Sequence, residues 1–322
     1  MGKVSLLEGL RVLEVGAGIA VPFAGRNLRL MGAEVCRVPV LDEQAEDRLP
    51  AALRGWLDDG KRKGAGRPDA SGFDLVIADG RAVDAVGPVD GALVSVLDMP
   101  PLASLPDGLA DSAVLSAIAG ATWAMGEVGR PPLSMPAHTA AFLAGVVFAG
   151  NSLGLLLRGE SGRHHSSGLL SIASFVDQNS TSYLHSGIGW RREGRRAAGS
   201  AGIYPYGIYD CADGQVALIA RSKRDWHGIA AALGAGDVSR RYPDPFEIAQ
   251  SLADVVDAEL RPIIQRLSRA EILETAERDG VLAVPVADLD DVESYNNLVD
   301  EREFWDFGAE SRFPGLPFLV SA

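Results

Sequence analysis

The stretch VLEVGAG, residues 12–18, decides the fold of this chain. Residues 10–15, LRVLEV, have the apolar pattern of a short buried strand, and a helical pattern follows the glycines and continues to residue 30. A turn that joins a strand to a helix in this way directs free backbone N–H groups toward an anion. Gly16, Ala17 and Gly18 are therefore candidate cofactor-binding residues.

The glycine turn alone leaves several interpretations open. A dinucleotide site would have a third glycine at position 21, which is Val21, and an acid at the end of the second strand, where Pro39 and Val40 stand. The turn is also similar to the first motif of S-adenosylmethionine-dependent methyltransferases, which prefer a further glycine near Ala20. A third interpretation is structural, because small residues let a strand and a helix pack closely.

Further strand patterns occur at residues 34–40, 73–78 and 92–97, with helix-length segments between the early ones. This alternation predicts βαβ units and a parallel sheet that is covered on both faces. Residues 58–71 are rich in Gly, Lys, Arg and Asp and show no periodicity. We expect them to form an exposed loop without a role in the core.

Two long helical patterns, at residues 138–157 and about 167–185, predict a helical hairpin around the polar stretch 158–166. The first helix is almost entirely small and apolar, which predicts burial on most of its sides. Glycines interrupt it, and no apolar run approaches the roughly 20 residues of a membrane helix. We therefore expect no membrane partner.

The composition changes at residue 187, where a basic and glycine-rich stretch predicts a linker between domains. The pattern after this linker predicts two strands around an Asp213-Gly214 turn. Helices are expected near residues 225–233 and 245–267, and Ser268 and Glu271 fit a capping box at the start of another. A strand at 281–289 and a helix near 292–299 follow.

The predicted domain division follows from this change. It assigns residues 1–190 to a large domain, 191–215 to the linker and the start of a small domain, 216–305 to the small domain and 306–322 to a C-terminal return segment.

Charge and cysteine content narrow the class of protein. The chain has 43 acidic and 30 basic side chains, and the formal net charge of −13 disfavours nucleic acid and anionic lipid as partners. The two cysteines, Cys36 and Cys211, are far apart and lack the spacing of a metal site or a disulfide framework. No signal peptide pattern precedes the first strand, so we expect a cytoplasmic protein.

Longer stretches resemble the class III CoA-transferases, the CaiB/BaiF family. Residues 6–40 match the opening of that family, LxGxRVLExx followed by a Pro-x-Ala-Gly helix and Gly-Ala-Glu-Val. Further matches follow in the family's order: SAIAGATWAMG at 116–126, ESGR at 160–163, PYGIYDCADGQVALIA at 205–220, VPVADLDDVESYNNLVDEREFWD at 284–306 and PGLPF at 314–318. Ordered matches over nearly the whole chain argue against chance similarity.

The resemblance implies a fold and an activity. The fold is a Rossmann-like large domain with a parallel sheet, a smaller α/β domain joined by two linkers, and two protomers interlocked like rings. The activity is CoA transfer between carboxylic acids, in which an aspartate attacks an acyl-CoA thioester and passes through a mixed anhydride to an enzyme-CoA thioester. A racemase branch uses the same aspartate for proton transfer. Coenzyme A would be carried as a thioester, and Arg37 joins Gly16, Ala17 and Gly18 as a candidate contact for CoA or a partner.

The aspartate of that family is replaced here. In the family it lies four residues after a proline and opens a long helix, and Pro136 and Gly162 fix this register so that Ala140 takes its place. An alanine methyl group neither attacks a thioester nor carries a proton. Three other departures concern CoA binding: Val40 replaces an arginine, Ile19 stands where some relatives have glutamine, and residues 97–108 replace a Ser-Gly-Phe-Gly stretch.

Other side chains are candidates to replace the aspartate. His138 lies two positions before Ala140, where its imidazole would act as a base or nucleophile, or would only bond backbone or solvent. His164 and His165 fall in a polar turn without a carboxylate or the i, i+4 spacing of a metal site, so we expect surface residues and no metal. The nearest carboxylates along the sequence are Asp177 and Glu127.

A basic cluster in the linker would receive a phosphate or the acidic face of a partner, unless it is only a solvated linker. Its members are Arg191, Arg192, Arg195 and Arg196. After it, Tyr204 and Tyr206 alternate with a proline and a glycine, which indicates sheet packing more than a site.

Four functions remain open at this stage. The first is a CoA-transferase subunit that has lost its own nucleophile and pairs with a catalytic homologue or with itself. The second is an enzyme of altered chemistry in which His138 or a carboxylate acts on an acyl-CoA. The others are a methyltransferase built on the glycine turn and a scaffold without a ligand.

Overall fold

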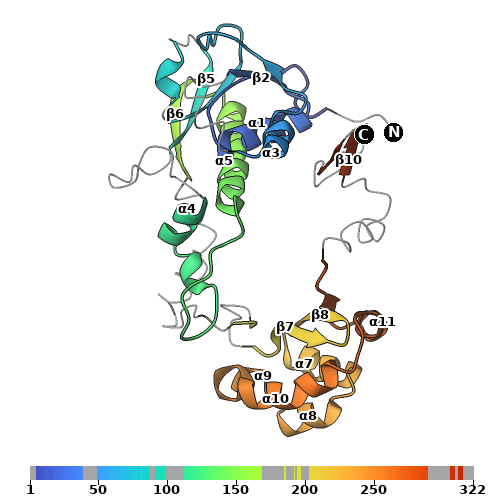
Figure 1. Ribbon diagram of the computed structural model, residues 1–322. Helices are drawn as coiled ribbons and strands as arrows, with labels where there is room; N and C mark the ends of the chain where they lie inside the picture. Colours follow the sequence, from blue (N-terminus) through green and yellow to red (C-terminus); the bar gives the residue numbers. More distant parts are fainter. Residues whose placement is uncertain are drawn as a thin grey trace. The chain divides into compact units, whose positions relative to one another are not determined.

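The computed structural model describes residues 5–38, 49–80, 82–87, 91–98, 112–168, 185, 192, 194–196, 203–288, 305–308 and 311–314. The chain divides into two compact units (Figure 1). The large unit comprises Met1–Thr122, Ser134–Gln178 and Arg302–Ala322, and the small unit comprises Trp123–Leu133 and Asn179–Glu301. The segment Trp123–Leu133 thus clusters with the small unit, although the sequence division placed it in the large domain.

The large unit contains a six-stranded sheet in the order β3-β2-β1-β4-β5-β6. All neighbouring strands pair in parallel. The strands are β1 (Arg11–Val15), β2 (Glu34–Val38), β3 (Arg62–Lys63), β4 (Leu75–Asp79), β5 (Leu93–Asp98) and β6 (Gly162–Ser167). This order is that of a Rossmann-like sheet, and the chain reverses its direction of travel beside β1, where such sheets bind ligands. The predicted α/β fold is confirmed.

Apolar side chains cover both faces of this sheet, because its parallel strands are buried on both sides. On one face the core joins Val12, Leu75 and Ile77 to the helices α1 (Ala20–Leu30) and α5 (Thr139–Leu157). On the other face it joins the alternate strand residues to the short helix η1 (Val83–Ala85). Other described helices of this unit are α3 (Ala51–Asp58) and α4 (Ser112–Ile118), and the 3-10 turn η2 (Thr122–Ala124) lies at the boundary with the small unit.

The helix α5 is held close to α1 by a glycine. A Cβ atom on Gly145 would lie 2.5 Å from the carbonyl oxygen of Ala20, so any larger residue would force the two helices apart. By length and composition α5 is able to cross a membrane, with a mean hydropathy of 1.9, contrary to the sequence expectation. Ala144, Phe148 and Ala149 lie in the core of the large unit.

The polar stretch after α5 is a strand and not the turn of a helical hairpin. Residues of this stretch form β6, which pairs along the whole of β5. The predicted second helix of the hairpin, about 167–185, falls almost entirely outside the described residues.

The small unit is an antiparallel sheet covered by helices. The sheet has the order β7-β8-β9, with β7 (Tyr206–Cys211), β8 (Gly214–Ile219) and β9 (Ala283–Pro285). Its helices are α7 (Lys223–Ala232), α8 (Gly236–Arg241), α9 (Pro245–Glu247), the π turn η3 (Ile248–Leu252), α10 (Ala253–Ile264) and α11 (Arg269–Asp279). They form one continuous apolar core with the sheet.

Several predictions for this unit are confirmed. The Asp213-Gly214 turn joins β7 and β8, and Ser268 and Glu271 form the capping box of α11. The predicted helix at 245–267 is found as α9, η3 and α10 in succession. The predicted helix near 292–299 lies outside the described residues, and the described residues after 288 form the antiparallel pair β10 (Trp305–Gly308) and β11 (Ser311–Pro314).

Candidate functional site

The sequence resemblance places the family aspartate at the start of α5. Ala140 lies in the first turn of the helix and is fully buried, and its methyl group packs against Leu115 of α4. The backbone N–H groups of Ala140 and Ala141 donate hydrogen bonds to the hydroxyl of Ser112, at 2.8 and 3.2 Å. A hydroxyl from α4 therefore satisfies the free donors that a residue of the helix itself usually caps.

This arrangement closes the position to substrate. Ser112 is buried and Ala140 has no exposed surface, so neither side chain offers solvent a nucleophile or a proton carrier. The sequence offered no signal for Ser112, because a single serine at the start of a short helix is common in any protein.

His138 is the residue that begins α5. Its backbone has φ 69°, in the left-handed region, which is uncommon for a residue other than glycine but several-fold more frequent for histidine than for most others. Its side chain does not cap the helix, and its ring lies 6.5 Å from that of Phe142 in an edge-to-face contact. Phe142 in turn contacts Phe23 and Trp56, so His138 stands beside an aromatic cluster.

The glycine turn is occupied by a carboxylate of the protein itself. Asp79, at the end of β4, accepts hydrogen bonds from the backbone N–H of Ala17 at 3.0 Å and from that of Ala82 at 2.8 Å. A Cβ atom on Gly16 would come within 3.3 Å of the Asp79 carboxylate, and Gly18 has φ +75°. The anion that this turn favours is thus internal, and the N–H of Ala17 is not offered to a cofactor phosphate.

Arg37, the other candidate cofactor contact, belongs to a buried network of charges. Its guanidinium pairs with Glu14 at 3.4 Å and with Asp58 of α3. Lys61 donates to Glu14 at 2.6 Å and to the carbonyl oxygen of Pro22 at 2.7 Å. The expectation that residues 58–71 have no role in the core is wrong, because Lys61 and Asp58 hold this segment to the sheet.

Burial sets the ionisation of this network. Burial raises the pKa of Glu14, and the positive charges of Lys61 and Arg37 oppose that rise. Burial likewise lowers the pKa of Lys61, against the effect of Glu14. A Cβ atom on Gly25 would lie 1.9 Å from the Glu14 carboxylate, so the glycine in α1 makes room for this carboxylate.

A small depression lies beside the turn. It is lined by Gly18, Pro22, Arg37, Leu49, Arg54 and Leu57. It has room for about one water molecule, and a phosphate group would require its walls to move. Gly18 and Arg37 meet here as the sequence predicted, but their role in binding CoA or a partner stays a prediction.

The two histidines after α5 lie in β6 and not in a turn. The Nδ1 atom of His165 is 2.7 Å from the Asp98 carboxylate, so a carboxylate accompanies it, contrary to expectation. The Nε2 atom of His164 is 3.1 Å from the carbonyl oxygen of Ser161. His165 and Asp98 are each about half exposed, with relative exposures of 50% and 46%, as in a surface pair. Within the described ranges no three metal-ligating side chains gather.

The linker arginines bind acids of the small unit. Arg195 pairs with Asp210, and Arg196 pairs with Asp254 at 2.9 Å and with Asp257 at 3.2 Å. Arg195 and Arg196 are therefore engaged by acids of the small unit. Arg192 is partly buried, and Arg191 lies outside the described residues.

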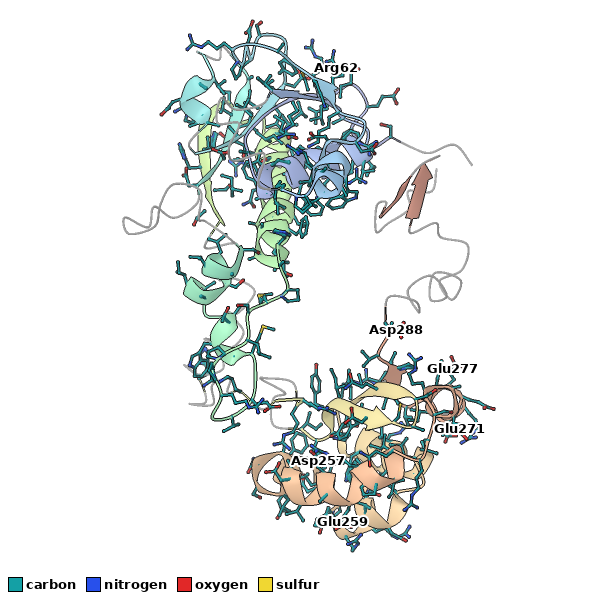
Figure 2. All side chains as sticks on the ribbon, viewed as in Figure 1. Arg62, Asp257, Glu259, Glu271, Glu277 and Asp288 are labelled. Atoms are coloured by element: carbon teal, nitrogen blue, oxygen red, sulfur yellow. The ribbon has the colours of Figure 1, made fainter. Side chains whose placement is uncertain are left out.

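Asp257, labelled in Figure 2, is the acid that several of these side chains share. It is buried in α10 and accepts hydrogen bonds from Tyr204 at 2.7 Å and from Arg261 at 3.0 Å, in addition to Arg196. Burial raises the pKa of Tyr204 further than the nearby Asp257 charge does, so the phenol stays protonated as the donor. Tyr206 lies in β7, and both tyrosines serve packing, as the sequence indicated.

The remaining carboxylate candidates give no catalytic geometry. Glu127 is mostly exposed and pairs with Arg130 at 3.5 Å. Asp177 lies outside the described residues.

Fold and site together define a class of protein: a Rossmann-like unit and a small antiparallel unit, with a long apolar helix whose first turn holds a buried alanine. The family model of CoA-transferase family III matches residues 109–319. The chain belongs to this family. No curated protein sequence matches it significantly.

Solved structures share the fold. One is a CaiB/BaiF family protein from Brucella suis, with a TM-score of 0.76 and 18% identity over 98% of this chain and 92% of that one. Another is Rv3272 from Mycobacterium tuberculosis, with a TM-score of 0.79 and 18% identity over 99% of this chain and 94% of the other. At this identity the likeness concerns the fold alone.

Proposed function

We propose that this chain is a subunit of a CoA-transferase family III assembly that does not supply the nucleophile and that pairs with a homologue bearing the catalytic aspartate. The family suggests CoA thioesters as the substrate class. The observation that carries the proposal is Ala140, which is fully buried against Leu115 with its N–H bound by Ser112.

Two further observations support a role other than catalysis. The glycine turn holds the Asp79 carboxylate through the N–H of Ala17, and Arg37 is engaged by Glu14 and Asp58. An acid at the turn disfavours a bound phosphate through like-charge repulsion, so this chain is a poor holder of CoA at that point.

The test is purification of the tagged chain from its native host, followed by identification of the proteins that remain bound. The proposal expects a stoichiometric homologue of the same family with aspartate at the position that corresponds to Ala140. Recovery of this chain with no other protein would count against the proposal.

One observation favours a second candidate, an enzyme of altered chemistry in which His138 acts on an acyl-CoA. Its left-handed backbone is costly and such conformations gather at functional sites. Calorimetric titration of the isolated chain with acetyl-CoA, and turnover lost on His138→Ala, would support that candidate. The family assignment gives no support to the methyltransferase alternative.

A further inference from the structure

The linker lies along the outer edge of β7 where it joins the small unit. The backbone N–H of Ile208 donates to the carbonyl oxygen of Arg195 at 3.0 Å, and Arg196 forms an antiparallel bridge with Gly207. A Cβ atom on Gly207 would lie 2.8 Å from the same carbonyl oxygen, so the glycine lets the two backbones approach. Residues 194–196, which we call the strap, thus lie on the edge of the sheet as a short added strand.

Charged side chains make the other contacts of the strap. Arg195 pairs with the half-exposed Asp210 of β7, and Arg196 pairs with the exposed Asp254 and the buried Asp257 of α10. The strap itself contains no apolar side chain. Ion pairs that contact solvent contribute little and are screened by salt, so the strap is held less firmly than the apolar core of the unit.

The acceptor for Arg196 keeps other partners when this arginine is absent. Asp257 also accepts hydrogen bonds from the Tyr204 hydroxyl at 2.7 Å and from Arg261 at 3.0 Å. No residue of the strap belongs to the apolar core of the unit. Release of Arg196 therefore leaves the buried carboxylate with two donors and the core in place. Opening of the strap should cost less free energy than unfolding of the unit, because segments with few buried contacts open locally.

We propose that the strap is a releasable latch, which opens and closes on the small unit while that unit stays folded. In the closed state the course of the linker over this unit is fixed. In the open state the linker is free to follow another course, and the N–H of Ile208 at the edge of β7 is free to bind an extended segment of another chain. The latch requires neither CoA nor a catalytic partner, so it stands apart from the proposed function.

The test is residue-resolved amide hydrogen exchange on the full chain, with two amides as reporters. The acceptor of the Ile208 amide is on the strap, whereas the buried Ala220 amide donates to the Pro205 carbonyl oxygen at 2.8 Å within the same unit. A rise in NaCl from about 0.01 M to about 1 M shortens the Debye length from about 30 Å to about 3 Å. Exchange of Ile208 should then become at least about threefold faster, with that of Ala220 unchanged, because salt screens the exposed pairs of the strap.

Arg196→Met removes the charge of the latch and keeps a long side chain. It should speed exchange of Ile208 at least about tenfold and that of Ala220 less than about twofold, since the small unit stays folded. Arg196→Lys restores the charge and should restore part of the protection of Ile208. The matched control is Arg241→Met, which removes an arginine that pairs with Glu259 of the same helix outside the strap and should leave both amides unchanged.

Two results would overturn the latch. One is exchange of Ile208 in step with Ala220 at both salt concentrations, which would mean that the strap opens only when the whole unit unfolds. The other is a folded Arg196→Met variant, verified by circular dichroism, in which Ile208 exchanges as slowly as in the unmodified chain. If Arg196→Met does not fold, the salt comparison on the unmodified chain decides.

Discussion

At the start of α5 a serine hydroxyl lies beside Ala140, the position that the sequence resemblance assigns to the family's aspartate. Ser112 accepts the N–H groups of Ala140 and Ala141, and Leu115 closes the space beside the Ala140 methyl. The surroundings of Ala140 thus fit a small side chain. Sequence alone predicted the replacement at Ala140, but not Ser112, which belongs to another helix and carries no pattern.

This packing makes a prediction for Ala140→Asp. The new carboxylate would be buried against Leu115 and would compete with Ser112 for the same N–H groups, so the free energy of unfolding should fall by about 2–4 kcal/mol. The variant should also gain no CoA-transfer activity. Urea denaturation and an acyl-CoA exchange assay are the measurements.

The matched control is Thr139→Asp, one residue earlier at the helix start, where the side chain is only partly buried. An acid there interacts favourably with the helix dipole, so the free energy of unfolding should change by less than about 1 kcal/mol. The packing account is contradicted if the two variants are equally stable.

Glu14 is the second residue that the sequence left unexplained. A glutamate stands inside the apolar run LRVLEV, and an acid within a buried strand implies a buried partner. The sequence therefore predicts that Glu14 has a buried partner. It does not identify Lys61 as that partner, because Lys61 lies in a polar segment without periodicity. The structure pairs their side chains at 2.6 Å, with exposures of 0% for Glu14 and 1% for Lys61.

Lys61→Met should therefore lower the free energy of unfolding by about 3–5 kcal/mol, because it leaves a buried charge without its main partner. Burial already raises the pKa of Glu14 and Lys61 opposes that rise, so the variant should raise this pKa further. The folded variant then holds a proton that the unfolded chain releases, and its stability should fall as the pH rises above the ordinary pKa of a glutamate, about 4.3.

Denaturation of the variant at several pH values measures this slope. Adding Glu14→Gln to Lys61→Met removes the titrating group and should remove the extra pH dependence. A Lys61→Met profile parallel to that of the unmodified chain would show that Glu14 does not depend on Lys61.

At the scale of elements, α10 anchors the linker to the small unit. Arg196 reaches two acids of this helix, of which Asp254 is 91% exposed and Asp257 only 4%. An exposed pair contributes little, whereas the loss of one buried partner leaves the other groups uncompensated. The two acids therefore form a natural comparison within one helix.

Asp257→Ala should lower the free energy of unfolding by about 3 kcal/mol, since it leaves Arg196 and the Tyr204 hydroxyl without their shared acceptor. Asp254→Ala should change it by less than about 0.5 kcal/mol. Denaturation followed by circular dichroism measures both. Equal losses would mean that burial does not decide the strength of this anchor.

Most elements could be predicted from hydrophobic pattern, and the exceptions have physical reasons. The strands β1, β4 and β5 are apolar runs that a buried parallel sheet requires. The strand β3 has two polar residues, and β6 reads GRHHSS, so neither has a hydrophobic alternation to detect. Edge strands are where such patterns are weakest, because one side of the strand has no neighbour.

At the scale of the whole molecule, membership of the family accounts for the fold, whereas the side chains at individual positions determine the activity. Pattern predicted a parallel sheet, but not its strand order, because order depends on contacts between segments far apart in the sequence. The division into two units was predicted near the linker, whereas the assignment of Trp123–Leu133 to the small unit rests on contacts that no local pattern reveals. The interlocked dimer and the catalytic partner stay predictions.

The most direct test of the proposed function traps the covalent intermediate. The copurified assembly is incubated with acetyl-CoA, quenched with hydroxylamine to convert an aspartyl thioester or anhydride into a hydroxamate, and each chain is weighed by intact-mass spectrometry. The account predicts a hydroxamate on the partner and none on this chain. A hydroxamate on this chain would contradict it.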